Sequence, residues 1–349
     1  MFPRGLLSIP WAAALVLIAG GSLARAQIPD LGGDAALTPP ADAFPAPDGL
    51  VAADFAAPHS AEPRATAGTA PSPLVGPRAK RVLIISEDGL RPDVLTALHL
   101  PWHESLWRHG SYSWKAQTIR TASTLPAHAA MLSGMDVDAH GLSWNNWQPS
   151  RGYIKVPTIF AIATAHHLTT AMFVGKWKLR HIATPGSVGV FERPGYYCNK
   201  VATAAAAYFV AEKPALTFVH FSDPDEAGHA KGWSSEAYRR AVAHSDRCLG
   251  ILLAALDSAD LTRDTLILVS ADHGGHNHTH SGKLRIDREI PWIAHGPGVR
   301  EGYRIHAAIT TVDTAATALF AHGLPIPESL VGKPVREIFR DGGGDLALP

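Results

Sequence analysis

The sequence predicts an α/β fold in which a mainly parallel central sheet carries helices on both faces. Short apolar runs rich in β-branched residues alternate with stretches whose apolar residues recur at helical spacing, and the 349-residue chain shows no internal repeat. This alternation is typical of strands connected by helices that cover the sheet. The predicted strands are residues 81–86, 170–174, 215–220, 265–270 and 290–294.

The first of these runs illustrates why they are interpreted as buried parallel strands. Residues 81–86 read Arg-Val-Leu-Ile-Ile-Ser, and the polar turn Glu87-Asp88-Gly89 follows. A strand that is apolar at successive positions has both faces covered, as in parallel sheets. Between the runs, the apolar residues of 235–258 lie close to helical spacing, and helices are also predicted at residues 156–166 and 202–213.

The N-terminus has the features of a secretory signal peptide. Met-Phe-Pro-Arg precedes an apolar run from Leu6 to Ala19, and Ala24-Arg25-Ala26 forms a cleavage site of the A-x-A type. We therefore interpret residues 1–26 as a signal peptide and expect a periplasmic or extracellular protein with no stable membrane anchor after cleavage. The alternative is an uncleaved anchor, but the run is shorter than the ~20 residues that a spanning helix needs.

The rest of the chain divides into a linker and one domain. Residues 27–78 are rich in Ala, Pro, Gly and Asp and lack a sustained apolar period, so a flexible linker is predicted. Residues 79–345 remain for one catalytic domain, a size that suits an α/β fold. The formal net charge of zero does not favour duplex nucleic acid as a partner. No sequence feature specifies the oligomeric state.

The chain contains only two cysteines, Cys198 and Cys248. In an oxidising compartment they could form one disulfide, but their spacing does not specify how far apart they lie in the fold. Neither belongs to a Cys-x-x-Cys motif, which argues against a cysteine-based zinc site.

Candidate metal ligands follow three of the predicted strands. Asp88 follows the first, Asp225 and His229 follow the third, and Asp272 with His273 follows the fourth. Because ligands of open α/β sheets bind at the carboxyl ends of the strands, we expect these loops to converge at one edge. Carboxylate and imidazole groups are typical zinc ligands, and this set suffices for two metal ions.

The segment after the fourth strand is unusually rich in imidazole. It contains Asp272 and four histidines, namely His273, His276, His278 and His280. Buried carboxylate and imidazole groups at a strand end need a partner, which a divalent cation supplies. A solvated His-rich loop is the alternative, although Gly274 and Gly275 favour a sharp turn close to a ligand.

Thr124 is the candidate nucleophile. It precedes Leu125 and Pro126 at the start of an Ala-rich helical stretch, so its hydroxyl would lie at a helix N-terminus, where backbone amides favour an anion. A helix-capping threonine is the commonest use of such a residue and is the alternative. The metal-ligand pattern favours the catalytic interpretation.

Six motifs occur in one order along the chain. They are Glu87-Asp88-Gly89-Leu90-Arg91, Thr124-Leu125-Pro126-Ala127-His128, His140-Gly141 with Asn145, Pro224-Asp225 with Gly228-His229, Asp272-His273-Gly274, and Val312-Asp313 with Thr317. Over residues 81–330 this order resembles the alkaline phosphatase superfamily, and specifically its type I phosphodiesterase and nucleotide pyrophosphatase branch. The resemblance implies an alkaline phosphatase-like core, here without a large cap.

The resemblance also implies a role for each candidate residue. One zinc would be held by Asp88, Thr124, Asp272 and His273. A second zinc would be held by Asp225, His229 and one further histidine, for which His280 fits best and His276 or His278 are alternatives. Thr124 would form a phospho-threonine intermediate, and Asn145 would donate to a phosphate oxygen. Divalent metals other than zinc would also fit these ligands.

The resulting prediction is an exported phosphoric ester hydrolase that acts on a small phosphate ester. The segment at Thr124 lacks the Cys-x-Pro-x-Arg or Ser-x-Pro-x-Arg pattern of sulfatases, and no cation directly follows Thr124, although Lys115 and Arg120 precede it. A diester carries less charge than a monoester, so phosphodiesterase or pyrophosphatase activity is favoured. The alternatives are a phosphomonoesterase or phosphonate hydrolase on the same metals, a sulfatase, and a non-catalytic periplasmic zinc-binding protein. The sequence does not specify the physiological substrate.

Overall fold

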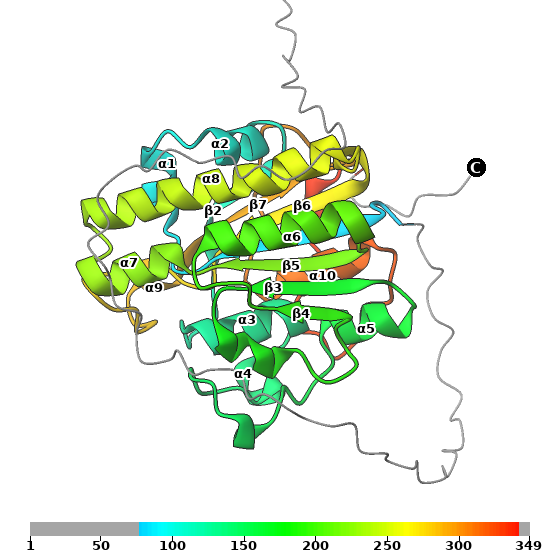
Figure 1. The fold of residues 1–349 in the computed structure, drawn as a ribbon, viewed down its shortest axis with the longest axis horizontal. Helices are drawn as coiled ribbons and strands as arrows, with labels where there is room; N and C mark the ends of the chain where they lie inside the picture. Colours follow the sequence, from blue (N-terminus) through cyan, green and yellow to red (C-terminus); the bar gives the residue numbers. More distant parts are fainter. Residues whose placement is uncertain (1–76, 342–349) are drawn as a thin grey trace, which may run out of the picture. The chain divides into compact units, whose positions relative to one another are not determined.

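An eight-stranded sheet forms the centre of residues 77–341, the part of the chain that the computed structural model describes (Figure 1). The predicted signal peptide, nearly all of the predicted linker and residues 342–345 of the predicted domain lie outside these residues. The strands in chain order are β1 (Arg81–Glu87), β2 (Ser111–Gln117), β3 (Thr170–Val174), β4 (Val190–Glu192), β5 (Leu216–Phe221), β6 (Thr265–Ser270), β7 (Glu289–His295) and β8 (Tyr303–Arg304). Their order across the sheet is β4-β3-β5-β1-β6-β7-β2-β8.

Most neighbouring strands are parallel, which confirms the predicted fold class. The strands β4, β3, β5, β1 and β6 pair in parallel, whereas β7 runs antiparallel to both β6 and β2. Residues 290–294, predicted as a strand, lie in β7. A parallel strand needs a covering crossover, and the connection from β6 to β7 contains only the four-residue helix α9 (Arg285–Arg288). The direction of β7 therefore reverses.

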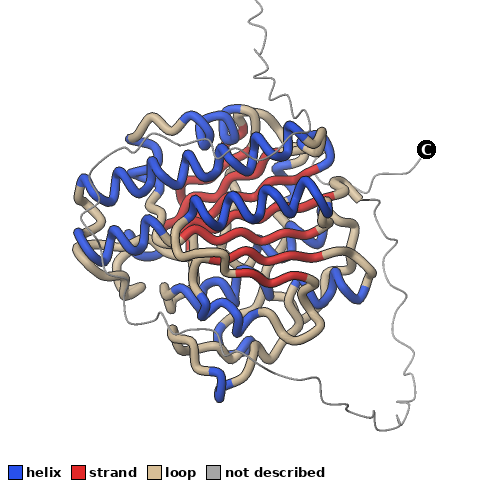
Figure 2. The backbone as a smooth tube through the Cα atoms, in the orientation of Figure 1, coloured by secondary structure: helices blue, strands red, loops and turns tan. Residues whose placement is uncertain are grey.

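Helices cover both faces of the sheet, as Figure 2 shows. Helices α6 and α8 lie on one face with α2, and helices α3, α5 and α10 lie on the other (Figure 1). The side chains of β1 alternate between the two cores: Leu83 and Ile85 pack beneath α6 and α8, and Val82 and Ile84 pack on the opposite side. The helices are α1 (Pro92–Ala97), α2 (Pro101–Arg108), α3 (Thr124–Ser133), α4 (Val137–His140), α5 (Ile159–Ala165), α6 (Cys198–Glu212), α7 (Asp223–Lys231), α8 (Glu236–Ser258), α9 and α10 (Asp313–Ala321).

The helices predicted at 156–166, 202–213 and 235–258 correspond to α5, α6 and α8, with shifted ends. Helix α5 begins later than predicted because Thr158 is its N-cap and accepts a hydrogen bond from the Ala161 N–H. Within residues 77–341, no helix combines the length and the apolar character needed to cross a membrane.

The segment after β5 is helical, although the sequence analysis interpreted it as a loop. Helix α7 starts with Asp223 and Pro224, and three acidic residues occupy its first turn. A proline at the first turn and acidic residues near the N-terminus are both favourable in a helix. The helix places Asp225 and His229, four residues apart, on the same side.

Candidate metal centre

The candidate ligands converge where three adjacent parallel strands end. β1 lies between β5 and β6 in the sheet, and the registers align Ser86 with both His220 and Ser270. The residues that follow these strand ends, Asp88, helix α7 and Asp272, therefore lie at one edge. This is the position at which open α/β sheets bind their ligands.

The first group consists of Asp88, Asp272 and His273, which are all fully buried. The Nε2 atom of His273 lies 3.3 Å from Asp88 Oδ1 and 3.3 Å from Asp272 Oδ2. None of these three atoms has a hydrogen-bond partner among the described residues. Unpaired buried polar atoms are costly, so their convergence favours a bound cation.

The other end of each of these side chains is anchored. Asp272 Oδ1 accepts from the N–H groups of Gly89 and His273 at 3.1 and 3.0 Å. His273 Nδ1 lies 2.8 Å from the carbonyl oxygen of Gly274. Because a carbonyl only accepts, Nδ1 carries a proton, and the lone pair of the neutral ring remains on Nε2. The protein thus orients three free donor atoms toward one point.

The second group consists of Asp225, His229 and His280. The Nε2 atoms of His229 and His280 lie 3.4 and 3.7 Å, respectively, from Asp225 Oδ1, and they lie 3.1 Å from each other. Asp225 Oδ1 has no hydrogen-bond partner among the described residues. The Nδ1 atoms of His229 and His280 face the carbonyl oxygens of His278 and Ala122 at 2.9 and 2.6 Å. In neutral rings, both Nε2 lone pairs therefore point at the same place, an arrangement that a cation stabilises.

Burial keeps the ring of His280 neutral. Its pKa is lowered to about 4, first by burial and then by the neighbouring His273. His280 is therefore available as a ligand at neutral pH. The side chain of His229 is 44% exposed, so this group faces solvent.

The alternative histidines are engaged elsewhere. His276 Nδ1 lies 2.6 Å from Asp287 Oδ1, and His278 Nδ1 lies 3.0 Å from the carbonyl oxygen of His229. Neither joins either ligand group. Of the three candidates, only His280 places a ring nitrogen beside both Asp225 Oδ1 and His229 Nε2.

Thr124 and Asn145 lie at the N-terminal end of α3, a helix that contacts the first group through His128. Thr124 is the first residue of α3 and is buried, and Ser123 rather than Thr124 is the N-cap. Asn145 Oδ1 accepts the Leu125 N–H at 2.9 Å, so its amide nitrogen remains as a donor. His128 Nδ1 lies 2.7 Å from the carbonyl oxygen of Thr124 and 3.5 Å from Asp272 Oδ2, which links α3 to the first group.

Lys176 is a charged residue of this site that the sequence analysis missed. Its ammonium lies 2.7 Å from Asp88 Oδ2 and also pairs with Asp225 Oδ2. It therefore contacts one carboxylate of each group through Oδ2, and the Oδ1 atoms are left without a hydrogen-bond partner among the described residues. Burial lowers the pKa of Lys176, but the two carboxylates outweigh it and hold that pKa well above its usual value. The residue directly follows Gly175 at the end of β3, the strand beside β5. The sequence signal that could have identified Lys176 is a basic residue directly after a predicted parallel strand.

His220 is a second missed residue. It lies inside β5, where its Nδ1 accepts the Gly175 N–H at 3.3 Å and its Nε2 lies 3.0 Å from Asp88 Oδ2. This arrangement makes Nε2 the donor to Asp88. Burial by itself raises the pKa of Asp88, yet Lys176 and the hydrogen bond from His220 hold that pKa well below its usual value. Asp88 is therefore an anion, as a metal ligand must be.

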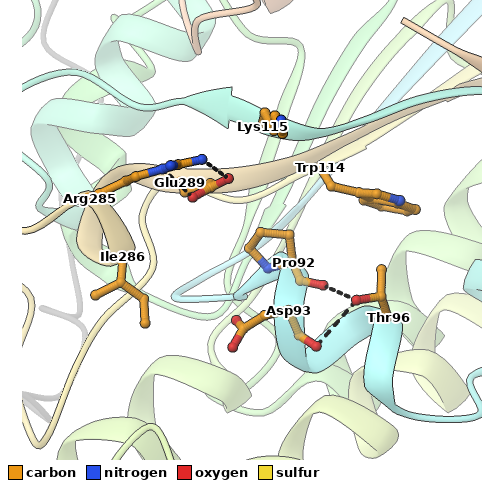
Figure 3. Close-up of a pocket in the computed structure, with 8 residues that line it drawn as sticks. All are labelled: Pro92, Asp93, Thr96, Trp114, Lys115, Arg285, Ile286 and Glu289. Atoms are coloured by element: carbon orange, nitrogen blue, oxygen red, sulfur yellow. Dashed lines mark hydrogen bonds and ion pairs between the residues drawn. The ribbon is translucent and has the colours of Figure 1, made fainter.

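A surface pocket lined by residues of α1, β2, α9 and the start of β7 contains none of these residues (Figure 3). Three of its four charged residues are paired: Arg285 pairs with Glu289 at 2.9 Å, and Asp93 pairs with Arg91 at 2.9 Å. The buried polar atoms without a hydrogen-bond partner gather instead at the two ligand groups, which remain the candidate site.

Comparison with known proteins identifies related chains. The family model described as type I phosphodiesterase / nucleotide pyrophosphatase matches residues 82–293. Human ectonucleotide pyrophosphatase/phosphodiesterase family member 5 is 22% identical over 232 residues, which cover 61% of this chain and 49% of that protein. Human arylsulfatase K is 30% identical over 100 residues, which cover 27% of this chain and 19% of that protein. The chain thus spans about half or less of these curated relatives.

A solved structure shares the fold. Murine ectonucleotide pyrophosphatase / phosphodiesterase 5, described as an inactive threonine-to-alanine variant in complex with AMP, superposes with a TM-score of 0.62 at 14% identity. The match covers 71% of this chain and 96% of that one. It supports the alkaline phosphatase-like α/β architecture.

Proposed function

This chain belongs to the type I phosphodiesterase / nucleotide pyrophosphatase family, and from that premise we propose that it hydrolyses small phosphate esters with two divalent metal ions and Thr124 as the nucleophile. The observation that carries this proposal is the convergence of potential ligand atoms. Asp88 Oδ1, Asp272 Oδ2 and His273 Nε2 form one set and have no hydrogen-bond partner among the described residues. The other set is Asp225 Oδ1, which also has no such partner, with the Nε2 atoms of His229 and His280 beside it.

The donor atoms fit a mixed nitrogen and oxygen site. Carboxylate oxygens and imidazole nitrogens are zinc ligands, and each set leaves room for a further ligand from Thr124, water or substrate. The proposed metals are two zinc ions. When bound, they would supply Lewis acidity toward the phosphoryl oxygens and a lowered pKa for a coordinated hydroxyl group.

The residues of the chain have distinct proposed roles. The hydroxyl oxygen of Thr124 attacks phosphorus, the new oxygen–phosphorus bond forms, and the bond to the departing alcohol breaks. Water then cleaves the phospho-threonine and restores the hydroxyl group. The amide nitrogen of Asn145, oriented by the Leu125 N–H, donates to a phosphate oxygen as charge develops.

The relatives support this reading of the site. The murine relative whose structure is described as inactive carries alanine in place of a threonine and holds AMP. A threonine-dependent activity on a small phosphate ester is therefore proposed for this chain as well. Thr124 is followed by Leu-Pro-Ala-His and lacks the sulfatase pattern, so a sulfatase is disfavoured.

Lys176 favours a second candidate function, hydrolysis of phosphate monoesters or phosphonates. The preference for diesters rested on the absence of a cation next to Thr124 in the sequence. The structure places the Lys176 ammonium between Asp88 and Asp225, so a cation is present in the site. An additional positive charge favours substrates that carry two negative charges.

A substrate panel tests the proposal. The purified protein should hydrolyse bis-p-nitrophenyl phosphate or p-nitrophenyl phosphate, lose activity to a chelator, and regain it when zinc is added. Turnover of p-nitrophenyl sulfate alone would point to a sulfatase. Tight zinc binding without turnover of any substrate would point to a metal-binding protein.

A further inference from the structure

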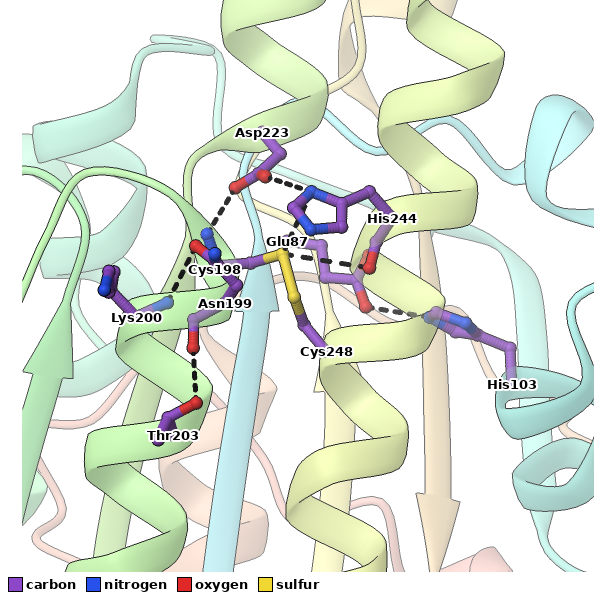
Figure 4. The surroundings of a disulfide bond; sticks show 9 residues. All are labelled: Glu87, His103, Cys198, Asn199, Lys200, Thr203, Asp223, His244 and Cys248. Atoms are coloured by element: carbon purple, nitrogen blue, oxygen red, sulfur yellow. Dashed lines mark hydrogen bonds and ion pairs between the residues drawn. A yellow bond between two sulfur atoms is a disulfide. The ribbon is translucent and has the colours of Figure 1, made fainter. Parts of the chain in front are cut away.

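A third cluster of potential metal ligands lies where α6, α7 and α8 meet, apart from the two ligand groups. Cys198 begins α6, Asp223 begins α7, and His244 and Cys248 belong to α8. Cys198 and Cys248 form a disulfide, with their Cα atoms 5.9 Å apart, and Figure 4 shows Asp223 and His244 beside it. Fifty residues separate the cysteines in sequence, so no short motif could indicate that they meet.

The four side chains are already within contact distance. Asp223 accepts the Cys198 N–H on Oδ2 at 2.8 Å, and its Oδ1 lies 2.9 Å from His244 Nδ1. His244 Nδ1 in turn lies 3.6 Å from Cys198 Sγ. The ligand atoms of Cys198, His244 and Cys248 all lie within 4.8 Å of one another.

These distances resemble those of a tetrahedral thiolate site. Zinc binds sulfur at about 2.3 Å and imidazole nitrogen at about 2.0 Å, so two such ligands at a tetrahedral angle lie about 3.5 Å apart. The Cys198 Sγ to His244 Nδ1 distance of 3.6 Å is already close to this value. The two sulfur atoms, now covalently bonded, would need to separate to about 3.8 Å.

We propose that reduction of the Cys198–Cys248 disulfide converts this cluster into a site for a thiolate-binding divalent cation such as zinc. A dithiol or phosphine reductant supplies two electrons to the disulfide and is itself oxidised, and each sulfur gains a proton. The cation then displaces both thiol protons, and the His244 proton, which Nδ1 donates to Asp223 Oδ1 in the oxidised chain, moves to Nε2 so that Nδ1 can bind. Asp223 Oδ1 is the fourth ligand.

The position of the cluster gives this exchange a structural role. Asp223, Cys198 and His244 come from the starts of α7 and α6 and from α8, so the cluster joins three helices at one point. Helix α7 carries Asp225 and His229. A metal would keep α7 attached to its neighbours in reducing surroundings, where the disulfide is lost. The side chain of His244 is 35% exposed, which provides an entry path.

Cobalt spectroscopy tests the inference on the full-length chain. Because the sulfur atoms are buried, the chain is unfolded, reduced with a phosphine and refolded with Co²⁺. Cobalt bound by thiolate gives a charge-transfer band in the near ultraviolet, whereas the Asp and His groups of the other sites cannot produce one. We expect this band, and one more cobalt ion per chain, in the reduced protein and not in the oxidised protein.

Variants distinguish this site from the others. In His244→Ala, the affinity of the reduced chain for Co²⁺, followed by the intensity of the band, should fall by at least about tenfold, while the disulfide still forms in the oxidised chain. Cys248→Ser should lower the intensity of the band. Asp88→Asn, in the first ligand group, should leave the band unchanged whether or not the chain is a hydrolase. A reduced, folded chain that shows no band, and whose thiols react equally fast with and without Zn²⁺, would refute the site.

Discussion

Lys176 and Asp88 form a buried ion pair in which the ammonium lies 2.7 Å from Asp88 Oδ2, while Asp88 Oδ1 faces His273 Nε2 at 3.3 Å. One carboxylate thus contacts a fixed cation with one oxygen and presents the other to the candidate metal. The same lysine pairs with Oδ2 of Asp225. Lys176 therefore joins the two ligand groups.

Replacing Lys176 tests this role. Lys176→Met leaves two buried carboxylate oxygens without their cation, and breaking a buried ion pair costs about 3–5 kcal/mol. We expect a lower melting temperature for the metal-free chain and a larger fall in kcat/KM for a monoester than for a diester. Lys283→Met, at an exposed position, is the control. Equal losses on both substrates would show that Lys176 positions the carboxylates without favouring the dianion.

Thr124→Ala should reduce turnover by at least about 10³-fold, because the proposed nucleophile is removed. The domain should remain folded, and most of the metal should remain bound. Ser123→Ala is a matched control, since the Ser123 side chain makes no capping hydrogen bond to α3. If Thr124→Ala keeps a rate near wild type, Ser123 and Thr121 become the nearest candidate nucleophiles.

His280→Ala should lower the zinc content toward one ion per chain and the rate by orders of magnitude, because the second group loses one of its two imidazoles. His276→Ala and His278→Ala should have smaller effects, since these side chains contact Asp287 and the His229 carbonyl. Metal analysis and kinetics on the three variants decide the assignment. If His276→Ala or His278→Ala loses zinc while His280→Ala keeps it, the third ligand of the second group must be reassigned to that histidine.

His103 should make the stability of the chain depend on pH. Its ring is fully buried, with Nε2 2.8 Å from Glu87 Oε1 and Nδ1 2.8 Å from Asp246 Oδ1. Burial alone would lower the pKa of His103, but the two carboxylates raise it to about 9.

The sign of the effect follows from the raised pKa. Unfolded histidine has a pKa near 6.5, so the stabilisation is complete below about pH 6.5 and is lost as pH rises toward about 9. We expect the free energy of unfolding of the metal-free chain to fall by about 3 kcal/mol across that window. His103→Gln should flatten this dependence, whereas His99→Gln, whose side chain is 84% exposed, should not. Identical slopes in wild type and His103→Gln would contradict the assignment.

Export is the remaining prediction. We propose that residues 1–26 are a signal peptide, and sequencing of the mature protein from the extracytoplasmic fraction should then give an N-terminus near Gln27. An intact Met1 on exported material would contradict cleavage.

Local patterns predicted most of the core. The apolar runs of β1, β3, β5 and β6 are contiguous and buried on both faces, so their composition alone distinguishes them from their surroundings. The strands β4 and β8, three and two residues long, carry no such pattern, and β2 contains polar and apolar residues together. Their pairing depends on neighbouring strands, and sequence periodicity does not report it.

Some residues of the candidate site could be named from the sequence, and others could not. Asp88, Asp225, His229, Asp272 and His273 were named from the sequence because each follows a strand whose end could be located. Lys176 and His220 were missed because their role comes from pairing with Asp88, a residue far away in sequence that lies 132 positions from His220. Likewise, the choice of His280 over His276 and His278 depends on which ring reaches Asp225.

Composition and the order of motifs along the chain are enough to predict the fold class, the family motifs and the kinds of ligand. The folded chain is needed to show which polar atoms lack a hydrogen-bond partner, that Lys176 lies between two carboxylates, and that Cys198 meets Cys248. Hydrogen-bond satisfaction and charge pairing are properties of atoms in space, so local sequence does not specify them. Residues that meet at the carboxyl ends of β1, β3, β5 and β6 are brought together by strand order, which local sequence does not encode.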